Sequence, residues 1–317
     1  MEGFLVIDKP AGITSHDVVA TVRAVTGLKK VGHTGTLDPF ATGVLPLALG
    51  GATKLIRFLD ESVKVYDATI ALGAATDTGD LTGEVIQTAP IPDFSDADVD
   101  SVLASFTGDR LQTPPAYSAV KKDGKALYKY AREGKTVTVP PRPITVYSLS
   151  IIERTPESLR VLLSCSRGTY ARVLGDDIAT ALGSRGHLRA LRRDQSGPFM
   201  LEGSLDFEQL GSMVAAEAGH DWREVFMGRK RGGVRWRPRD EVRGEVLARV
   251  VSPLAALSHL PRVVVEGAVA TAVRNGAKPP ACADAGTGER YAVVTGGELL
   301  AVAENGPQGG KSLRVLA

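Results

Sequence analysis

The sequence has few cysteines and no long hydrophobic run. Its two cysteines, Cys165 and Cys282, lie far apart and lack the spacing of metal ligands. Such sparse cysteine is typical of a reduced setting, so a cytoplasmic localisation is expected. No run of about 18 apolar residues occurs, and the first apolar stretch, Phe4 to Ile7, is short, so neither a membrane span nor a secretory leader is predicted.

The excess of basic over acidic residues is also small. The formal net charge is only +2 over 317 residues, which by itself indicates no nucleic-acid partner, because a total hides local clustering. Glycine and proline are plentiful, at 35 and 18 residues, and 43% of the chain is hydrophobic. This composition predicts many turns, substantial β structure and enough apolar material for two domains.

Hydrophobic periodicity predicts strands and helices in irregular order. Strands are expected at 4–8, 63–72, 144–152 and 159–164, and helices from Thr14 or Ser15 to Gly27, at 54–59, after a capping box at Ser95, and at 170–182. The elements do not alternate as regular βαβ units. The expected fold class is therefore α+β, with a mixed, largely antiparallel central sheet flanked by helices.

Two features mark the C-terminal third of the chain. Seven basic residues crowd 227–243 beside Asp240 and Glu241, a pattern that we interpret as an exposed basic loop. After Pro261, short alternating runs separated by Gly-rich turns predict a small β-barrel. The expected domains are therefore 1–250, which includes the basic loop, and 258–317.

Basic residues also cluster in two other places. The segment 117–135 combines lysines with three tyrosines, so that lysines would meet phosphates while tyrosines stack on bases. The same pattern also suits a solvated amphipathic helix with Leu127 and Tyr130 on its core face, and both interpretations stay open. The second cluster has more cations than a solvated face usually carries: Arg185, His187, Arg189, Arg192 and Arg193.

The segment 76–83 contains Asp77-Thr78-Gly79, which is similar to the triplet of aspartic proteases. Those enzymes need two such carboxylates sharing a proton, and the sequence holds one copy. We therefore interpret the segment as a polar loop.

The most informative segment is GHTGTLDPFATGVLP, from Gly32 to Pro46. It is an aperiodic, Gly-rich stretch in which Asp38 is followed by a proline and then by an apolar run. From chemistry alone, such an aspartate is more often a turn residue or a helix cap than a catalyst.

This segment resembles the catalytic motif of the TruB family, the bacterial tRNA pseudouridine-55 synthases. Other segments within about the first 200 residues also resemble the family and occur in the family's order: 5–10, 64–69, 76–78, 112–121, 142–144, 165–172 and 191–193. The resemblance implies the pseudouridine synthase fold and a mobile RNA-clamping insertion at about 108–143. It also implies that the small C-terminal β-barrel is a PUA-like RNA-binding domain. The basic segment 227–243 has no counterpart in this resemblance.

The resemblance also implies the activity: isomerisation of uridine 55 in the T-stem-loop of tRNA to pseudouridine. Asp38 would be the nucleophile or proton acceptor, Arg172 the cation that keeps it ionised, and Tyr66 the ring that stacks on the uracil and handles the C5 proton. The target base would be flipped out of its stack, with His33 filling part of the vacated space. Further substrate-binding positions are Lys9, Tyr170 and Leu191, and the lysines expected to meet phosphate are Lys121, Lys122 and Lys125.

The chemistry breaks an N1–C1′ bond and forms a C5–C1′ bond, so that no atoms enter or leave, and neither a metal nor a cofactor is expected. A hydrolysing glycosidase usually has two carboxylates, whereas an isomerase that excludes water needs one. An RNA-binding or tRNA-folding protein and a carboxylate-dependent hydrolase are the alternatives. Asp38, Tyr66 and Arg172 together favour the isomerase, which is expected to act on tRNA as a monomer.

Overall fold

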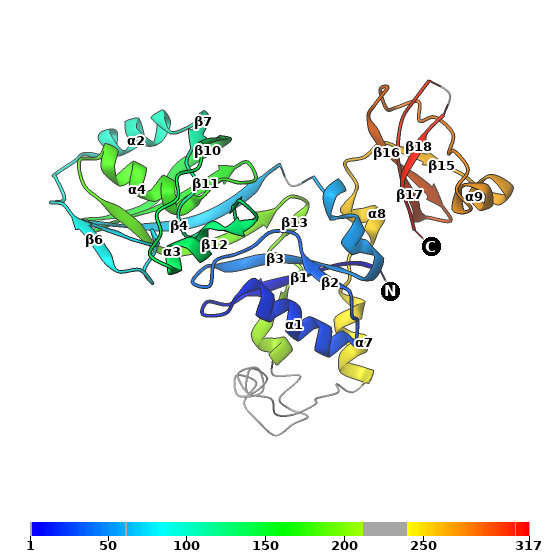
Figure 1. The fold of residues 1–317 in the computed structure, drawn as a ribbon, viewed down its shortest axis with the longest axis horizontal. Helices are drawn as coiled ribbons and strands as arrows, with labels where there is room; N and C mark the ends of the chain where they lie inside the picture. The colour runs from blue at the N-terminus through cyan, green and yellow to red at the C-terminus, as the bar shows by residue number, and fades with distance from the viewer. Residues whose placement is uncertain (1, 61, 212–239, 308, 317) are drawn as a thin grey trace.

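The computed structural model describes residues 2–60, 62–211, 240–307 and 309–316. These residues form a ten-stranded central sheet in the order β14-β1-β3-β12-β4-β11-β10-β7, with β13 beside β12 and β2 beside β3 (Figure 1). Only the pairs β1–β14 and β3–β12 are parallel within it. The mixed, largely antiparallel sheet that the sequence predicted is therefore confirmed.

The strands of this sheet have the following bounds: β1 Gly3–Lys9, β2 Val31–His33, β3 Thr42–Leu49, β4 Lys64–Leu72, β7 Gly108–Gln112, β10 Arg142–Thr155, β11 Ser158–Cys165, β12 Gly186–Ser196, β13 Phe199–Met200 and β14 Leu205–Asp206. Strand β4 shows the alternation that predicted it, since Tyr66, Ala68, Ile70 and Leu72 are buried on one face. Alternation thus decides which β4 side chains enter the core, Tyr66 among them.

The helices α1 Ser15–Thr26, α2 Asp96–Ser105 and α4 Ala171–Ala181 pack on this sheet. Capping boxes begin two of them, Thr14 with Asp17 at α1 and Ser95 with Asp98 at α2. Gly27 ends α1 with φ +70°, a conformation that glycine adopts without steric cost. These boundaries agree with the sequence prediction.

The helix expected at 54–59 is replaced by two 3₁₀ turns, η1 Gly50–Lys54 and η2 Ile56–Phe58. The prediction of helical spacing there was wrong about the helix type. Gly50 and Gly51 are poor helix formers, and the apolar residues Leu55, Phe58 and Leu59 are buried from 3₁₀ turns instead.

The C-terminal part forms a separate sheet in the order β15-β16-β17-β18, with bounds Arg262–Val264, Arg290–Thr295, Glu298–Glu304 and Lys311–Val315. Helix α9, Gly267–Arg274, accompanies it, as Figure 1 shows at the red end of the chain. A hydrophobic cluster joins Phe4 and Val44 of the central sheet to Leu257 and Val294. The arrangement is consistent with the PUA-like domain expected there, and α8, Pro253–Ala256, lies between the two parts.

The basic segment expected at 227–243 lies largely outside the described residues, up to position 239. Its last four residues, 240–243, are not a loop but the start of α7, Asp240–Ala248. The helix forms there because Val242, Val246 and Leu247 pack against the hydrophobic core that contains Val18 and Val22 of α1.

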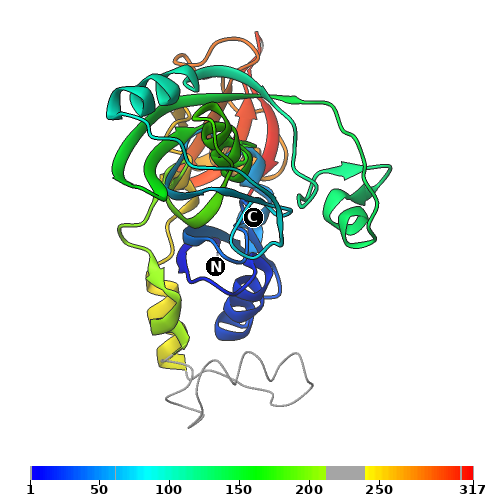
Figure 2. The ribbon, with the colours of Figure 1, turned by 90° about the vertical axis from the view of Figure 1, so that its left-hand side faces the viewer.

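The expected insertion begins and ends inside the sheet, because β7 pairs with the start of β10, Gln112 opposite Arg142. The segment that leaves the sheet is therefore 113–141. It carries β8 Lys121–Lys122, β9 Lys125–Ala126 and α3 Leu127–Arg132, and Figure 2 shows this part standing away from the body. A small second hairpin, β5 Ala74–Thr76 with β6 Val85–Thr88, follows β4. No helix in the described part of the chain is long and apolar enough to cross a bilayer.

The capping box of α2 allows a test of the fold. Ser95→Ala removes the hydroxyl that accepts from the Asp98 backbone N–H and is expected to lower the free energy of unfolding by about 1 kcal/mol. Denaturant unfolding of both proteins measures the difference. An unchanged unfolding midpoint would show that this cap contributes nothing to stability.

Candidate active site

Asp38 lies in the loop between β2 and β3, and Arg172 lies in the first turn of α4. The fold brings them together: Arg172 Nε donates to Asp38 Oδ2 at 2.8 Å. The arginine side chain is only 4% exposed, whereas that of Asp38 is 36% exposed. The carboxylate is thus paired with a buried cation on one side and open to a ligand on the other.

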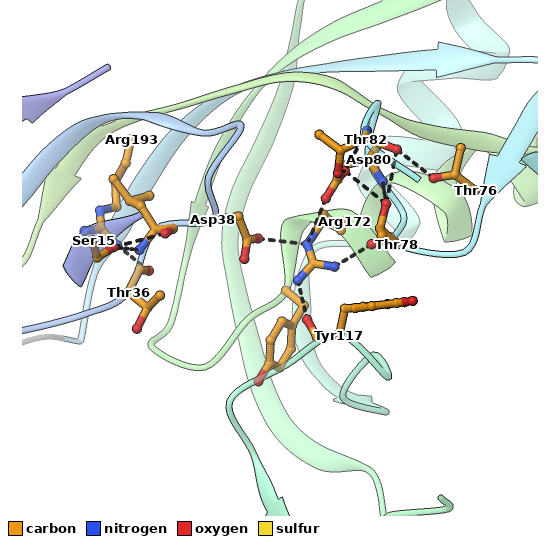
Figure 3. Close-up of polar contacts among 12 residues, drawn as sticks. Ser15, Thr36, Asp38, Thr76, Thr78, Asp80, Thr82, Tyr117, Arg172 and Arg193 are labelled. Carbon is orange, nitrogen blue, oxygen red and sulfur yellow. Dashed lines mark hydrogen bonds and ion pairs between the residues drawn. The ribbon is translucent and has the colours of Figure 1, made fainter. Parts of the chain in front are cut away.

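Three chain segments bind the Arg172 guanidinium (Figure 3). Besides the bond to Asp38, Nη1 donates to the Thr78 carbonyl and Nη2 donates to the Tyr117 carbonyl at 2.8 Å. A second carboxylate, that of Asp80, has its Oδ2 3.9 Å from Nε. Arg172 is therefore held in one orientation by the loop 34–41, the loop 76–84 and the root of the insertion.

Asp80 is a site residue that the sequence reasoning missed, because 76–83 was interpreted only as a polar loop. Its side chain is 7% exposed. Its Oδ1 accepts from the hydroxyl and the backbone N–H of Thr82, at 2.6 and 2.9 Å, and from the Thr78 hydroxyl at 3.0 Å. The repeated Thr and Asp residues of this loop were the sequence signal that could have identified Asp80. The Asp80 carboxylate lies close to the same Nε that binds Asp38 (Figure 3), and because it is buried it supports Arg172 from within the protein.

Side chains from elsewhere hold the backbone on both sides of Asp38. The Ser15 hydroxyl donates to the Leu37 carbonyl at 3.0 Å and accepts from the Leu37 N–H at 2.9 Å. On the other side, Lys9 Nζ donates to the Pro39 carbonyl at 3.3 Å. The aspartate is therefore the half-exposed member of a loop whose neighbouring peptides are fixed.

Arg193 also holds the loop that carries Asp38. This residue is 2% exposed, and it donates to the carbonyls of Gly35, Thr36 and Val44. In the register of β12 with β4, Arg193 pairs with Tyr66. The buried arginine thus connects the Asp38 loop with the expected stacking ring.

Lys9 is fully buried, and its ammonium also donates to the carbonyls of Pro10 and Ile13, at 2.8 and 2.9 Å. Burial lowers the pKa of Lys9 from 10.5 to about 8, although the nearby Asp38 carboxylate raises it. With its donors directed at backbone carbonyls, Lys9 is placed to hold the active-site loop rather than to touch a substrate.

The other expected site residues lie on different elements. Tyr66 is 9% exposed, and burial raises its pKa above the ordinary value of 10, which the Arg193 charge opposes. Leu191 is buried on β12. Tyr170 precedes α4, and the Gln112 side chain binds both its N–H and its carbonyl, at 2.7 and 3.1 Å. His33 is half-buried at the end of β2.

The three expected phosphate contacts lie on the insertion. Lys121 and Lys122 are exposed on β8, and Lys122 Nζ donates to the Thr138 carbonyl at 2.9 Å. Lys125 forms an ion pair with Glu133 at 2.5 Å, and its Nζ lies 4.5 Å from the centre of the Tyr130 ring. Because the Lys125 charge is compensated within the insertion, Lys121 and Lys122 are the better placed for phosphate.

The cation cluster on β12 has partners inside the fold. Arg185 is bound to Asp176, Arg192 Nη2 lies 2.7 Å from Asp8 Oδ2, and His187 Nδ1 lies 2.8 Å from the Ala74 carbonyl. The excess of cations there therefore reflects internal pairing. Among the residues that the structure describes, no group of three His, Cys, Asp or Glu side chains is arranged to bind a metal ion.

A family model described as "TruB family pseudouridylate synthase (N terminal domain)" matches residues 23–171, which include Asp38 and Tyr66. Solved structures agree over the whole fold. A chain of a crystal structure of a Cbf5-Nop10-Gar1 complex superposes with a TM-score of 0.69 at 26% identity, covering 99% of this chain and 84% of that one. Fold and site together define a pseudouridylate synthase.

Curated relatives narrow this class. The tRNA pseudouridine synthase B of Geotalea uraniireducens is 43% identical over 98% of this chain and 93% of its own length. That of Geobacter sulfurreducens is 45% identical over 96% and 94%. The chain belongs to the TruB family.

The buried ammonium of Lys9 makes stability depend on pH. At about pH 7 Lys9 is charged in the folded and the unfolded state, so the folded protein bears the cost of burying the charge. Between its folded pKa, about 8, and its unfolded value the folded state binds fewer protons, and stability therefore rises with pH. Relative to Lys9→Met, the wild type should gain stability from about pH 7 to about pH 9.5.

Denaturant unfolding of wild type and Lys9→Met at both pH values measures this gain. The difference between the two proteins cancels groups that titrate equally in both. A difference that stays constant or falls with pH would contradict burial as the main influence on Lys9.

Proposed function

We propose that this protein isomerises uridine 55 in the T-stem-loop of tRNA to pseudouridine, with Asp38 as the essential catalytic group. The observation that carries the proposal is the 2.8 Å pair between a half-exposed Asp38 and a buried Arg172. A cation held in place beside a carboxylate keeps that carboxylate ionised when a ligand displaces water from it. The names of the relatives supply the substrate class, tRNA.

The reaction exchanges one bond for another within the same nucleoside. The N1–C1′ bond breaks, the uracil turns, and C5 forms a bond with C1′; the C5 proton is lost and N1 gains a proton. The Asp38 carboxylate can attack the sugar, attack the base, or remove a proton toward a glycal-like intermediate, and the proposal covers all three routes. In each route the Arg172 guanidinium compensates the charge on the carboxylate.

The other expected residues are assigned the roles that the family resemblance implies. The Tyr66 ring would stack on the flipped uracil and handle the C5 proton, with Tyr170 and Leu191 lining the pocket. His33 would occupy part of the space that the flipped nucleotide leaves. The insertion would close over the stem-loop, and the C-terminal domain would contact a more distant part of the tRNA. The proposal includes action as a monomer in the cytoplasm, without a cofactor.

An RNA-binding protein without catalysis is the alternative from another class. The support for an enzyme is that Asp38 keeps an exposed oxygen while three side chains immobilise its neighbouring peptides. A protein that only binds RNA has no need of this arrangement. A hydrolase would need a second carboxylate facing the substrate, and Asp80 is turned toward Arg172 instead.

Asp38→Asn should abolish pseudouridine formation and leave tRNA affinity largely intact, because phosphate contacts supply most of the affinity. Tritium release from C5-labelled T-stem-loop RNA in single turnover measures the chemistry, and filter binding measures affinity. Asp100→Asn, an exposed aspartate on α2, is the matched control and should be fully active. Normal turnover by Asp38→Asn would refute the proposal.

Replacing Lys121 and Lys122 by glutamine should weaken tRNA binding and flatten its salt dependence. Each lost phosphate contact reduces the slope of log affinity against log salt by about 0.7–0.9. Lys125→Gln should change the slope much less, because Glu133 already compensates that charge. Equal slopes for wild type and the double variant would remove these two lysines from the RNA-binding surface.

A further inference from the structure

Tyr117 lies where the insertion departs from the body of the protein. Before it, Gln112 is bound to the Tyr170 backbone, and Pro114 and Pro115 restrict the backbone between. This root of the insertion, 112–117, is therefore attached to the start of α4.

After Tyr117 the chain enters a small unit of its own, residues 118–135. The Tyr128 N–H donates to the Ser118 carbonyl at 3.1 Å, and the Leu127 N–H donates to the Val120 carbonyl at 2.8 Å. These bonds tie the start of the unit to α3. Tyr117 is thus the last residue of the root and the neighbour of the protruding unit that carries Lys121 and Lys122 (Figure 2).

Two polar groups of Tyr117 meet the active site. Its carbonyl accepts from Arg172 Nη2 at 2.8 Å, and its hydroxyl donates to Asp77 Oδ2 at 3.2 Å. Asp77 is joined by a peptide bond to Thr78, whose carbonyl accepts from Arg172 Nη1. The four residues therefore form a closed ring of interactions around one side of the guanidinium.

The side of this ring opposite to Tyr117 is rigid. The Asp77 N–H donates to the Glu84 carbonyl at 3.0 Å, and Asp77 Oδ1 accepts from the Glu84 N–H at 2.9 Å. Partial burial and the Asp77 carboxylate raise the pKa of Tyr117, so its hydroxyl stays protonated and donates. If the root of the insertion moved, the contact between Tyr117 and Arg172 would therefore change, whereas the Asp77 loop would keep its position.

We propose that Tyr117 is a positioning residue that couples the unit 118–135 to Arg172. When RNA binds the unit 118–135, the Tyr117 carbonyl fixes the position of Arg172 Nη2. The hydrogen bond from the Tyr117 hydroxyl to Asp77 keeps the Tyr117 backbone in place relative to Thr78. Arg172 then presents Nε to Asp38 in one orientation. This inference rests on the proposed function, since it concerns catalysis on an RNA that contacts the insertion.

The test removes the hydroxyl bond and keeps the ring and the carbonyl. Tyr117→Phe should lower the single-turnover rate of tritium release about threefold to tenfold, the effect of losing one net hydrogen bond. Its affinity for T-stem-loop RNA should stay within about twofold, because the ring and the lysines are intact. In Asp77→Ala, which lacks the acceptor, the additional change Tyr117→Phe should have no further effect on the rate.

Tyr147→Phe is the matched control, because it loses a similar bond, from its hydroxyl to the Ser62 carbonyl at 3.3 Å, on an exposed part of β10. It should react at the wild-type rate. A wild-type rate for Tyr117→Phe, additive losses in the double variant, or a loss confined to affinity would each overturn the inference. Absence of tritium release by the wild type would instead refute the proposed function, so the two failures are distinguishable.

Discussion

The buried charge of Arg172 is the constraint on which the site depends. An uncompensated guanidinium in a protein interior costs several kcal/mol, so each of its donors needs a partner. Asp38, Thr78 and Tyr117 supply acceptors, and the Asp80 carboxylate lies close by. Two carboxylates thus share one cation, and of the two only that of Asp38 is open to a ligand.

The supporting contacts around Asp38 are directed at the backbone. Ser15, Lys9 and Arg193 bind main-chain groups of the residues around Asp38 and so determine the shape of the loop. A carboxylate on a loop held in this way needs little reorganisation when the reaction begins. The loop is aperiodic because its order comes from these contacts rather than from a helix or a strand.

Sequence patterns predicted the central elements well. The period of β4, the capping box of α2 and the C-terminal glycine of α1 each depend on neighbouring residues, and each is present in the structure. The patterns were wrong at 54–59, where glycines and burial favour 3₁₀ turns, and at 240–243, where packing on the core makes a helix of residues that were assigned to a basic loop. The family resemblance placed the ends of the insertion inside the sheet, because strand pairing of β7 with β10 is not a local property.

By itself, the sequence determined the fold class, the family and the identity of Asp38 as the residue to examine, since periodicity and an ordered set of motifs are properties of the linear chain. The family resemblance already implied Arg172 as its partner, and only the tertiary structure decided what else surrounds the pair. Asp38, Thr78, Tyr117 and Arg172 come from four separate stretches of the chain. The physical reason is that charge compensation acts through space, so the partners of a buried cation are selected by the folding of the sheet and not by their order in the chain.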